Sequence, residues 1–462
     1  MAVNMQHSTP PIPLAEAVRV WLRIACLSFG GPAGQIAVMH RILVDEKRWI
    51  GEARFLHALN YCMLLPGPEA QQLATYVGWL MHRTAGGLIA GGLFVLPGLL
   101  SIMALSWVHA IWGETTIVQG LFLGLKAAVL AIVLQAVVRI GARVLKARPM
   151  AAIAAGAFAA IFLFRVPFPL IVAGAAFAGF VGAKRGWPGF APASAGERGA
   201  KDDTSSRLGE SLPPHAHPPR RARTLRVALV WGLAWLLPVA ALWLVLGPTH
   251  VFTQIAAFFS WLAVVTFGGA YAVLAYVAQH AVEVRGWLDA REMLDGLGMA
   301  ETTPGPLIMV TQFVGFMAAY RAPGALDPLA AATLGGLLTT WVTFAPCFLW
   351  IFVGAPYVEA LRANRALAGA LAAVSAAVVG VILNLALWFA VHTMFARTER
   401  WRWLGMTLDL PVPASASWPS IALALVAFAA VFGLRLGTLT VIAGCAALGL
   451  ALQSTVWIGA GG

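Results

Sequence analysis

The chain has 462 residues, of which 60% are hydrophobic and 11% are charged. A soluble domain carries about twice that share of charge, so the composition excludes an ordinary soluble protein. The formal net charge is +12, but much of the basic charge lies in one polar segment, which argues against a nucleic-acid-binding surface. The four cysteines are scattered without metal-ligand or redox spacing, and we expect neither a metal site nor a cofactor.

Apolar segments long enough to cross a bilayer recur along the chain, and they lack the alternation of barrel strands. Because the bilayer offers the backbone no hydrogen bonds, such segments must be helices. We therefore predict an all-α polytopic membrane protein. The expected spans cover residues 14–44, 55–81, 86–112, 115–139, 150–164, 168–183, 225–246, 251–281, 290–320, 328–354, 365–391, 420–432 and 436–457.

Helix breaks interrupt the first two expected spans. Phe29-Gly30-Gly31-Pro32 lies near the middle of the first, and Pro66-Gly67-Pro68 lies in the second. Proline ends one helix because it lacks the N–H group, and it suits the first position of the next helix. Glu69 follows the triplet directly, so a carboxyl group is expected at a break at membrane depth.

The stretch after residue 183 differs in character from the rest of the chain. Residues 184–226 hold nine basic and four acidic side chains with clustered Pro, Gly and Ser, which is typical of a solvated linker. His215 and His217 lie there without further ligands, so surface positions are favoured over a metal site. We predict an N-terminal half over residues 1–183, the linker over 184–224, a connecting helix over 225–250 and a C-terminal half over 251–462.

The two halves carry the same motifs in the same order. Ser28-Phe29-Gly30-Gly31 matches Thr266-Phe267-Gly268-Gly269 at an offset of 238 residues, and Pro66-Gly67-Pro68 matches Pro304-Gly305-Pro306 at the same offset. Further along, Pro97 matches Pro346 at an offset of 249. Ordered motifs at constant offsets indicate an internal duplication.

Loop charges predict how the halves are oriented. If each broken element returns to its starting side, the basic loops over residues 41–54 and 139–148 share one side with the linker, and the positive-inside rule makes that side cytoplasmic. The span over residues 225–246 then inverts the second half, whose loop over residues 283–292 is net negative. We therefore predict an inverted-topology repeat with a site between broken helices near the midplane. Parallel halves are the alternative if the Phe-Gly-Gly elements cross fully.

The broken helices favour a site for an anion. A helix that starts inside the membrane presents unpaired N–H groups and the positive end of its dipole. Glycine in the triplets allows close approach to the backbone, and Thr302 and Thr303 can add hydroxyl donors or cap a helix. The alternative is that the triplets are structural kinks. The candidate substrate residues are Gly30, Gly31, Pro66, Gly67, Pro68, Lys126, Gly268, Gly269, Thr302, Thr303, Pro304, Gly305, Pro306 and Gln312.

Three ionisable side chains are expected inside the membrane. Glu69 and Glu301 are candidates for proton coupling, because intramembrane acids often belong to proton relays. A helix-terminal acid is the alternative for Glu69, and for Glu301 the functional and structural interpretations are equally favoured. Lys126 lies in mid-span and needs a carboxylate, backbone carbonyls or an anionic substrate as its partner; a snorkelling or helix-pairing lysine is the alternative. Gln312 can donate to an oxyanion or join helices.

The ordered motifs resemble the chromate ion transporter family, whose long members have two homologous halves. The resemblance covers nearly the whole chain apart from the linker. It implies a secondary transporter that exports chromate from the bacterial cytoplasm across the inner membrane, with halves of opposite orientation, and thereby gives chromate resistance. The resemblance rests on Phe29-Gly30-Gly31-Pro32, Pro66-Gly67-Pro68-Glu69, Gly124-Leu125-Lys126, Phe267-Gly268-Gly269 and Glu301-Thr302-Thr303-Pro304-Gly305-Pro306.

Other functions stay open at this point. A sulfate or other oxyanion uptake carrier is the main alternative, because sulfate has the charge and shape of chromate. An anion channel is less favoured. An integral-membrane enzyme is also less favoured, because the sequence has no nucleotide-binding glycine loop and no His-Glu-x-x-His motif. The expected partners are chromate or sulfate and the lipid bilayer, without nucleic acid, and a homodimer is left open.

Overall fold

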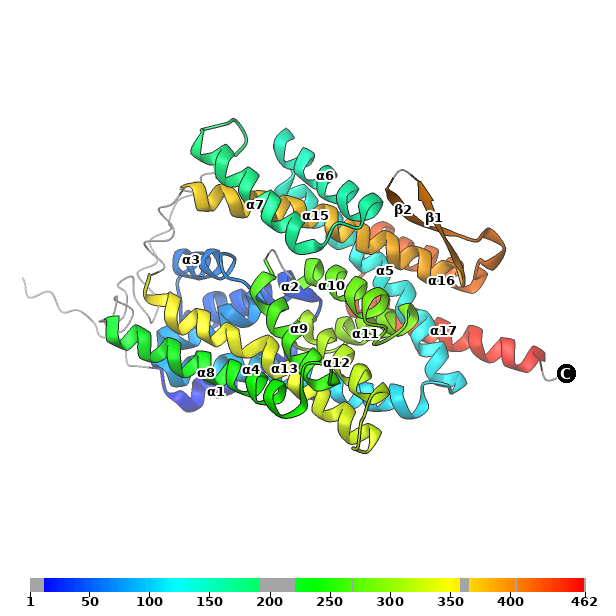
Figure 1. Ribbon diagram of the computed structural model, residues 1–462, viewed down its shortest axis with the longest axis horizontal. Helices are drawn as coiled ribbons and strands as arrows, with labels where there is room; N and C mark the ends of the chain where they lie inside the picture. Colours follow the sequence, from blue (N-terminus) through cyan, green and yellow to red (C-terminus); the bar gives the residue numbers. More distant parts are fainter. Residues whose placement is uncertain (1–11, 191–220, 268–269, 358–364, 404, 461–462) are drawn as a thin grey trace, which may run out of the picture.

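The computed structural model describes residues 12–190, 221–267, 270–357, 365–403 and 405–460, and within these ranges it is almost entirely helical. Five of the described helices are long and apolar enough to cross a bilayer, and several shorter apolar helices accompany them. The prediction of an all-α polytopic membrane protein is confirmed. Most of the long helices lie roughly along one direction of the molecule (Figure 1).

The first half begins with short helices on either side of the Phe-Gly-Gly break, which we call the broken arm, and longer helices follow. The long helix α4 changes direction at His82 and Arg83, where the backbone leaves helical geometry, so its first part is a short half-helix. The break predicted at Pro66-Gly67-Pro68 is present between α3 and α4. The elements are α1 Leu14–Leu27, α2 Gly31–His40, the π-helical turn η1 Arg41–Glu46, α3 Glu52–Cys62, α4 Glu69–Trp112, α5 Thr116–Val144, α6 Arg148–Phe164 and α7 Phe168–Lys184.

The second half repeats this order after the connecting helix α8 (Arg221–Leu246). Its helices start where the sequence caps them: Asp289 and Glu292 form a capping box at α11, and Asp327 accepts from two N–H groups of α13. The elements are α9 Val251–Val265, α10 Ala270–Ala278, η3 Gln279–Val284, α11 Ala290–Thr302, η4 Leu307–Met309, α12 Val310–Arg321, α13 Pro328–Gly354, η5 Ala355–Tyr357, α15 Arg365–Met394, α16 Trp418–Phe428, η7 Ala429–Gly433 and α17 Thr438–Ala460.

An antiparallel hairpin between α15 and α16 was not predicted. Strands β1 (Thr398–Trp403) and β2 (Met406–Pro411) pair from Thr398 with Pro411 to Trp403 with Met406, and the 3-10 turn η6 (Pro413–Ser415) follows. Arginine and tryptophan alternate along β1, which suits a strand exposed at an interface. The hairpin lies at the end of the molecule toward which α17 runs, at the right of Figure 1.

Three sequence offsets relate elements of the two halves, and we call residues matched in this way equivalent. The offset of 238 carries η1 onto η3, residue by residue. An offset of 249 relates α5 to α15, and an offset of 270 carries the start of α7, Phe168, onto the start of α17, Thr438. Equivalent backbone bonds recur: Trp49 N–H donates to Leu43 O at 2.8 Å, and Trp287 N–H donates to Ala281 O at 2.8 Å. This agreement supports the predicted duplication.

Each half packs its last two helices against the other half. Helix α5 contacts α16 and α17, and the equivalent α15 contacts α6 and α7. Glycines allow these helices to approach: Gly120 lies against Gly449, and the equivalent pair Gly369 and Gly179 lie against each other. The halves are therefore interlocked.

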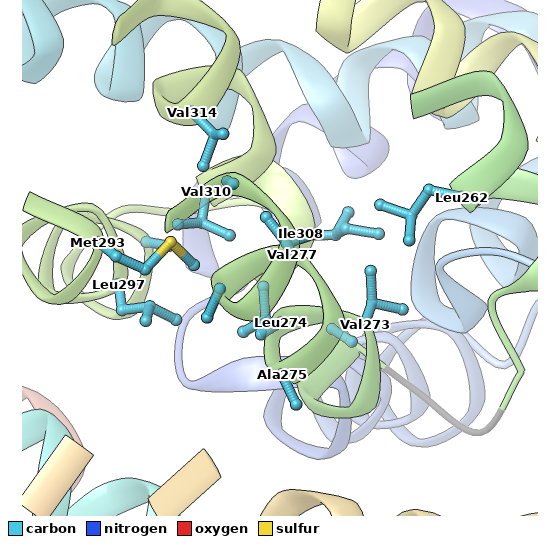
Figure 2. Close-up of a cluster of buried hydrophobic side chains, with 14 of the residues drawn as sticks. Leu262, Val273, Leu274, Ala275, Val277, Met293, Leu297, Ile308, Val310 and Val314 are labelled. Atoms are coloured by element: carbon cyan, nitrogen blue, oxygen red, sulfur yellow. The ribbon is translucent and has the colours of Figure 1, made fainter. Parts of the chain in front are cut away.

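The largest buried cluster surrounds α10. Val273, Leu274 and Val277 of α10 point toward side chains of α11 and of the η4–α12 segment, as Figure 2 shows. Most described side chains of α10 are buried. The cluster also includes residues of α5, α6 and α7, so this core joins the two halves.

Candidate functional site

The first break begins where α3 ends and finishes at the start of α4. Gly67 has φ +118°, a backbone conformation that favours glycine, and this lets the chain turn between the two helices. The first helical bond of α4 is from Gln72 N–H to Pro68 O at 3.0 Å. Within the described residues, the N–H groups of Glu69, Ala70 and Gln71 therefore have no backbone or capping partner. These are the unpaired donors that a half-helix start predicts.

The second break has the same backbone geometry. Gly305 has φ +108°, and the chain continues through η4 into α12. Thr302 belongs to helix α11, which precedes the break. Its hydroxyl donates to Gly298 O and Met299 O of that helix. No side chain caps the start of η4 or of α12. Of the two roles left open for Thr302, capping of the following helix is therefore not formed here, and hydroxyl donation to an anion stays a prediction.

Each triplet is bonded to the Phe-Gly-Gly break of the other half. Gly67 N–H donates to Thr266 O at 2.9 Å, and the equivalent Gly305 N–H donates to the equivalent Ser28 O at 2.9 Å. The Gln35 side chain adds a third bond, from Nε2 to Gly305 O at 2.6 Å. We call this reciprocal contact the seam. It brings all four breaks of the helices into one region, as a site between the halves requires.

The triplet glycines also contact the proline-containing long helix of the other half. A Cβ on Gly67 would lie 3.0 Å from Cys347 Sγ of α13, and one on Gly305 would lie 3.0 Å from Gly98 Cα of α4. Cys347 and Gly98 follow Pro346 and Pro97, so this contact is reciprocal as well. In this structure the space at both glycines is filled by protein, and their role toward an anion stays a prediction.

The two predicted acids have different surroundings. Glu69 is half-buried and has no hydrogen bond or ion pair to any described residue. Glu301 is buried, with 1% of its surface exposed, and its Oε1 accepts from Tyr271 Oη at 2.8 Å while Oε2 has no partner in the described part of the chain. Tyr271 in turn approaches Gly31, where a Cβ would lie 3.1 Å from Tyr271 Oη. Glu301 is therefore tied to the first half through Tyr271.

Lys126 has a carboxylate as its partner. Its Nζ lies 2.9 Å from Asp295 Oδ1, and the two side chains are 17% and 9% exposed. No donor is aligned with that oxygen, so the contact is an ion pair rather than a directed hydrogen bond. Lys126 comes from α5 and Asp295 from α11, so the pair joins the halves. Sequence reasoning missed Asp295, although an acid six residues before Glu301 in an apolar stretch was a usable signal.

Gln312 also lies on an inter-half contact. Its Nε2 donates to Leu99 O of α4 at 3.0 Å, and its Oε1 accepts from Thr340 Oγ1 at 3.3 Å. The predicted role of joining helices is therefore present. Gln71 and Gln72 are fully buried near the first break and each has an unpaired Oε1 in the described structure. Polar atoms are thus concentrated along the seam.

The remaining predicted residues are placed as follows. Gly30 and Gly31 have φ +78° and +75° at the start of α2, which explains two glycines at that break. Thr303 is buried directly before the second triplet. Gly268 and Gly269 lie outside the described residues, as do His215 and His217. Among the described residues, no three His, Cys, Asp or Glu side chains are grouped to hold a metal ion.

Comparison with known proteins gives a consistent result. A sequence model of the family described as "Chromate transporter" matches residues 15–180 and 253–450. The chain is 32% identical over 378 residues to a chromate transport protein of Pseudomonas aeruginosa, covering 81% of this chain and 80% of that protein. It is 28% identical over 384 residues to a chromate transport protein of Cupriavidus metallidurans, covering 82% and 84%. A probable chromate transport protein of Synechococcus elongatus is 26% identical over 379 residues, covering 82% and 85%. No solved structure matches the chain.

Proposed function

Because the chain belongs to the chromate transporter family, we propose that it is a membrane carrier that moves chromate across the bilayer. Chromate is a tetrahedral dianion, so a carrier must offer it positive charge and hydrogen-bond donors at membrane depth. The seam supports this function most directly. Each triplet is bonded to the opposite break, so the half-helix starts of both halves are gathered in one place. Discontinuous helices of this kind hold anionic groups in secondary transporters.

Lys126 is proposed to supply charge for the dianion. In the structure the neighbouring Asp295 carboxylate neutralises it. A chromate oxygen can replace Asp295 beside the ammonium group if the aspartate takes a proton or moves aside. Unpaired N–H groups at the start of α4 then add donors from the first half. In this proposal Asp295 keeps Lys126 paired whenever substrate is absent, which avoids an isolated buried charge.

Export is the direction that the membrane potential favours. A dianion that leaves a cell with a negative interior gains about 2.3 kcal/mol per charge for each 100 mV, so about 4.6 kcal/mol in all. Uptake of the same ion requires at least two compensating protons. An ionised Glu69 near the seam opposes the dianion, so binding is proposed to favour its protonated form. Glu69 is therefore the first candidate for proton coupling, and Glu301 is the second.

We further propose that the two halves have opposite orientations in the bacterial inner membrane. The halves are residues 1–183 and 251–462, joined by the linker over 184–224 and the helix region over 225–250. The course of equivalent helices supports this arrangement: α7 ends at the left of Figure 1, whereas α17 runs to the C-terminus at the right. The basic loops then lie in the cytoplasm and the hairpin lies outside.

Chromate accumulation in cells with and without the protein tests the direction of transport. Expressing cells are expected to hold less chromate, and an ionophore that collapses the potential should remove the difference. Higher accumulation in expressing cells would contradict export. It would favour the alternative of a sulfate or other oxyanion uptake carrier that admits chromate because the two ions share charge and shape.

A further inference from the structure

We propose that the protein is closed at the hairpin end by an ion-pair latch centred on Arg165, and that Arg435 is the equivalent latch, open in this structure, for the other end. The inference rests on the proposed carrier function. It goes further by naming the contacts that alternate between two states. Elements that are equivalent in sequence make different contacts in the two halves, and this difference supports the proposal.

The latch at the hairpin end joins three parts of the chain. Arg165, in the turn between α6 and α7, pairs through Nη1 with Glu283 Oε2 of η3 at 2.5 Å. Its Nη2 pairs with Asp409 of β2, and Arg400 of β1 pairs with the same aspartate at 3.3 Å. The side chains of Arg165, Glu283 and Asp409 are only 24%, 20% and 19% exposed. The latch therefore connects the first half to the second half and to the hairpin.

A partly open cavity lies beside this latch. It has a volume of about 210 Å³ and is lined by all three latch residues and by Ala275 and Ala278 of α10. The cavity is already partly open, and release of Arg165 from its lining would widen it. A path from the hairpin end toward the seam would then run along α10, which starts next to the second Phe-Gly-Gly break.

Arg435 occupies the same backbone position in the second half. Arg165 has φ +51° and Arg435 has φ +53°, both unusual for arginine. The following N–H groups make the same bond six residues back, Val166 to Ala160 O at 3.1 Å and Leu436 to Ala430 O at 3.0 Å. The offset of 270 relates all of these positions. The two turns are thus the same motif in two copies.

The acidic partner is duplicated too, but the second pair is not formed. The equivalent of Glu283 at the offset of 238 is Asp45, the matching position of η1. Asp45 is 61% exposed and lies 3.5 Å from the His40 ring. Arg435 is exposed and has no ion pair within the described residues. Among the described residues, one arginine is therefore ion-paired and its equivalent is not.

The broken arms show the same difference. In α10 the described side chains are buried nearly all round, as the cluster in Figure 2 illustrates. In the equivalent α2, only Gly31, Gln35 and Met39 are buried. Helix α10 also packs on α15, whereas among the described residues α2 makes at most a marginal contact with α5. The second arm is closed against the other helices, and the first arm is not.

A shift along the arm accompanies this difference. At the start of α7, the Phe168 ring lies 5.9 Å from the Tyr276 ring of α10. The equivalent start of α17, Thr438, lies beside Gly30, with its Oγ1 3.8 Å from where a Cβ on Gly30 would be. If both halves made the same contacts, Thr438 would lie beside Val38, the equivalent of Tyr276. Eight residues of helix correspond to about 12 Å, so the starts of α7 and α17 contact the two arms at clearly different levels.

Thiol labelling of the purified protein in nanodiscs tests the proposal without measuring transport. Ala37 is exposed on α2 and its equivalent Ala275 is buried on α10, so cysteine at either position reports on one end. The background carries Ser in place of Cys26, Cys62, Cys347 and Cys445, and it must first unfold at the same temperature as the wild-type protein. The structure predicts fast labelling of Ala37→Cys by a charged maleimide and slow labelling of Ala275→Cys.

Each of the two arginines, Arg165 and Arg435, is then replaced by alanine in a separate variant. Arg165→Ala should raise the labelling rate at Ala275→Cys about tenfold and lower it at Ala37→Cys, because removing a partly buried ion pair shifts the balance of states. Arg435→Ala is the matched control and should shift both rates the opposite way. Unchanged rates in Arg165→Ala, or equal effects of the two variants, in protein with unaltered thermal stability would overturn the latch. Since transport is not measured, that outcome would leave the proposed function standing.

Discussion

Lys126 and Asp295 have opposite charges, come from different halves, and lie within 2.9 Å of each other in a largely buried place. A lone lysine at membrane depth required a partner, and the sequence left open whether that partner was a carboxylate, a carbonyl or the substrate. The answer depends on tertiary packing, because α5 and α11 are far apart in sequence. Position alone made Lys126 a candidate, whereas its partner became evident only from the structure.

Lys126→Ala is predicted to lower chromate transport at least about tenfold, the scale of a charge-assisted hydrogen bond, and Lys126→Arg should restore it only in part because the guanidinium is wider and planar. Initial rates against chromate concentration give the measurement. The double variant Lys126→Ala/Asp295→Ala is the control for structure. If that double variant transports normally, the pair serves packing and not substrate binding.

Glu69→Gln is predicted to remove the pH dependence of transport while the protein remains in the membrane. In the proposal the protonated carboxyl favours the dianion, so wild-type transport should rise as pH falls, and a neutral glutamine should hold it near the acid-side rate. Rates at several pH values, with the internal and external pH kept equal, provide the test. A glutamine variant with the wild-type profile would assign the coupling to Glu301 instead.

The breaks are the elements that sequence reasoning located best. Proline and glycine determine where a helix can end, so both triplets and the first Phe-Gly-Gly element appear where they were predicted. Their mutual bonds were not predictable, because Gly67 and Thr266 meet only after both halves fold. The hairpin was missed for another reason. A two-stranded ribbon at an interface is short and has no buried face, so it lacks the periodic apolar signal of a core strand.

Gly305→Ala is predicted to destabilise the protein by about 2–3 kcal/mol, because φ +108° suits glycine and the new Cβ would meet Gly98 Cα at 3.0 Å. Gly405→Ala in the hairpin is the matched control, since it has φ +79° and open space around it. Thermal unfolding in detergent should show a clearly larger loss for Gly305→Ala. Equal losses would mean that the seam is not tightly packed at the second triplet.

At the scale of the whole molecule, exchanged helices hold the halves together. Contacts of α5 with α17 and of α15 with α7 pass between the halves. The matching order of elements in the two halves was predictable because the motifs recur at constant offsets. The packing of the last two helices of each half against the other half was not predictable, because these helices have few distinctive residues. The difference in burial between α2 and α10 was not predictable either, because the two helices occupy equivalent positions in the sequence.

Cleavage of the linker is therefore predicted to leave an active protein. A protease site introduced near Ser205 can be cut in purified material. The halves should then copurify and retain chromate transport at a rate close to that of the uncut protein. Dissociation, or loss of transport with both halves still in the membrane, would show that the linker contributes to the fold or to the cycle.

We propose that this chain is a chromate carrier whose substrate passes between two broken helices. Flux of labelled chromate in proteoliposomes, under an imposed potassium-diffusion potential, tests this function most directly. We expect saturable flux away from the negative side, competition by sulfate, and strong loss in Lys126→Ala but not in Gly405→Ala. Flux no greater than in protein-free liposomes, or flux that rises linearly without saturation, would contradict it.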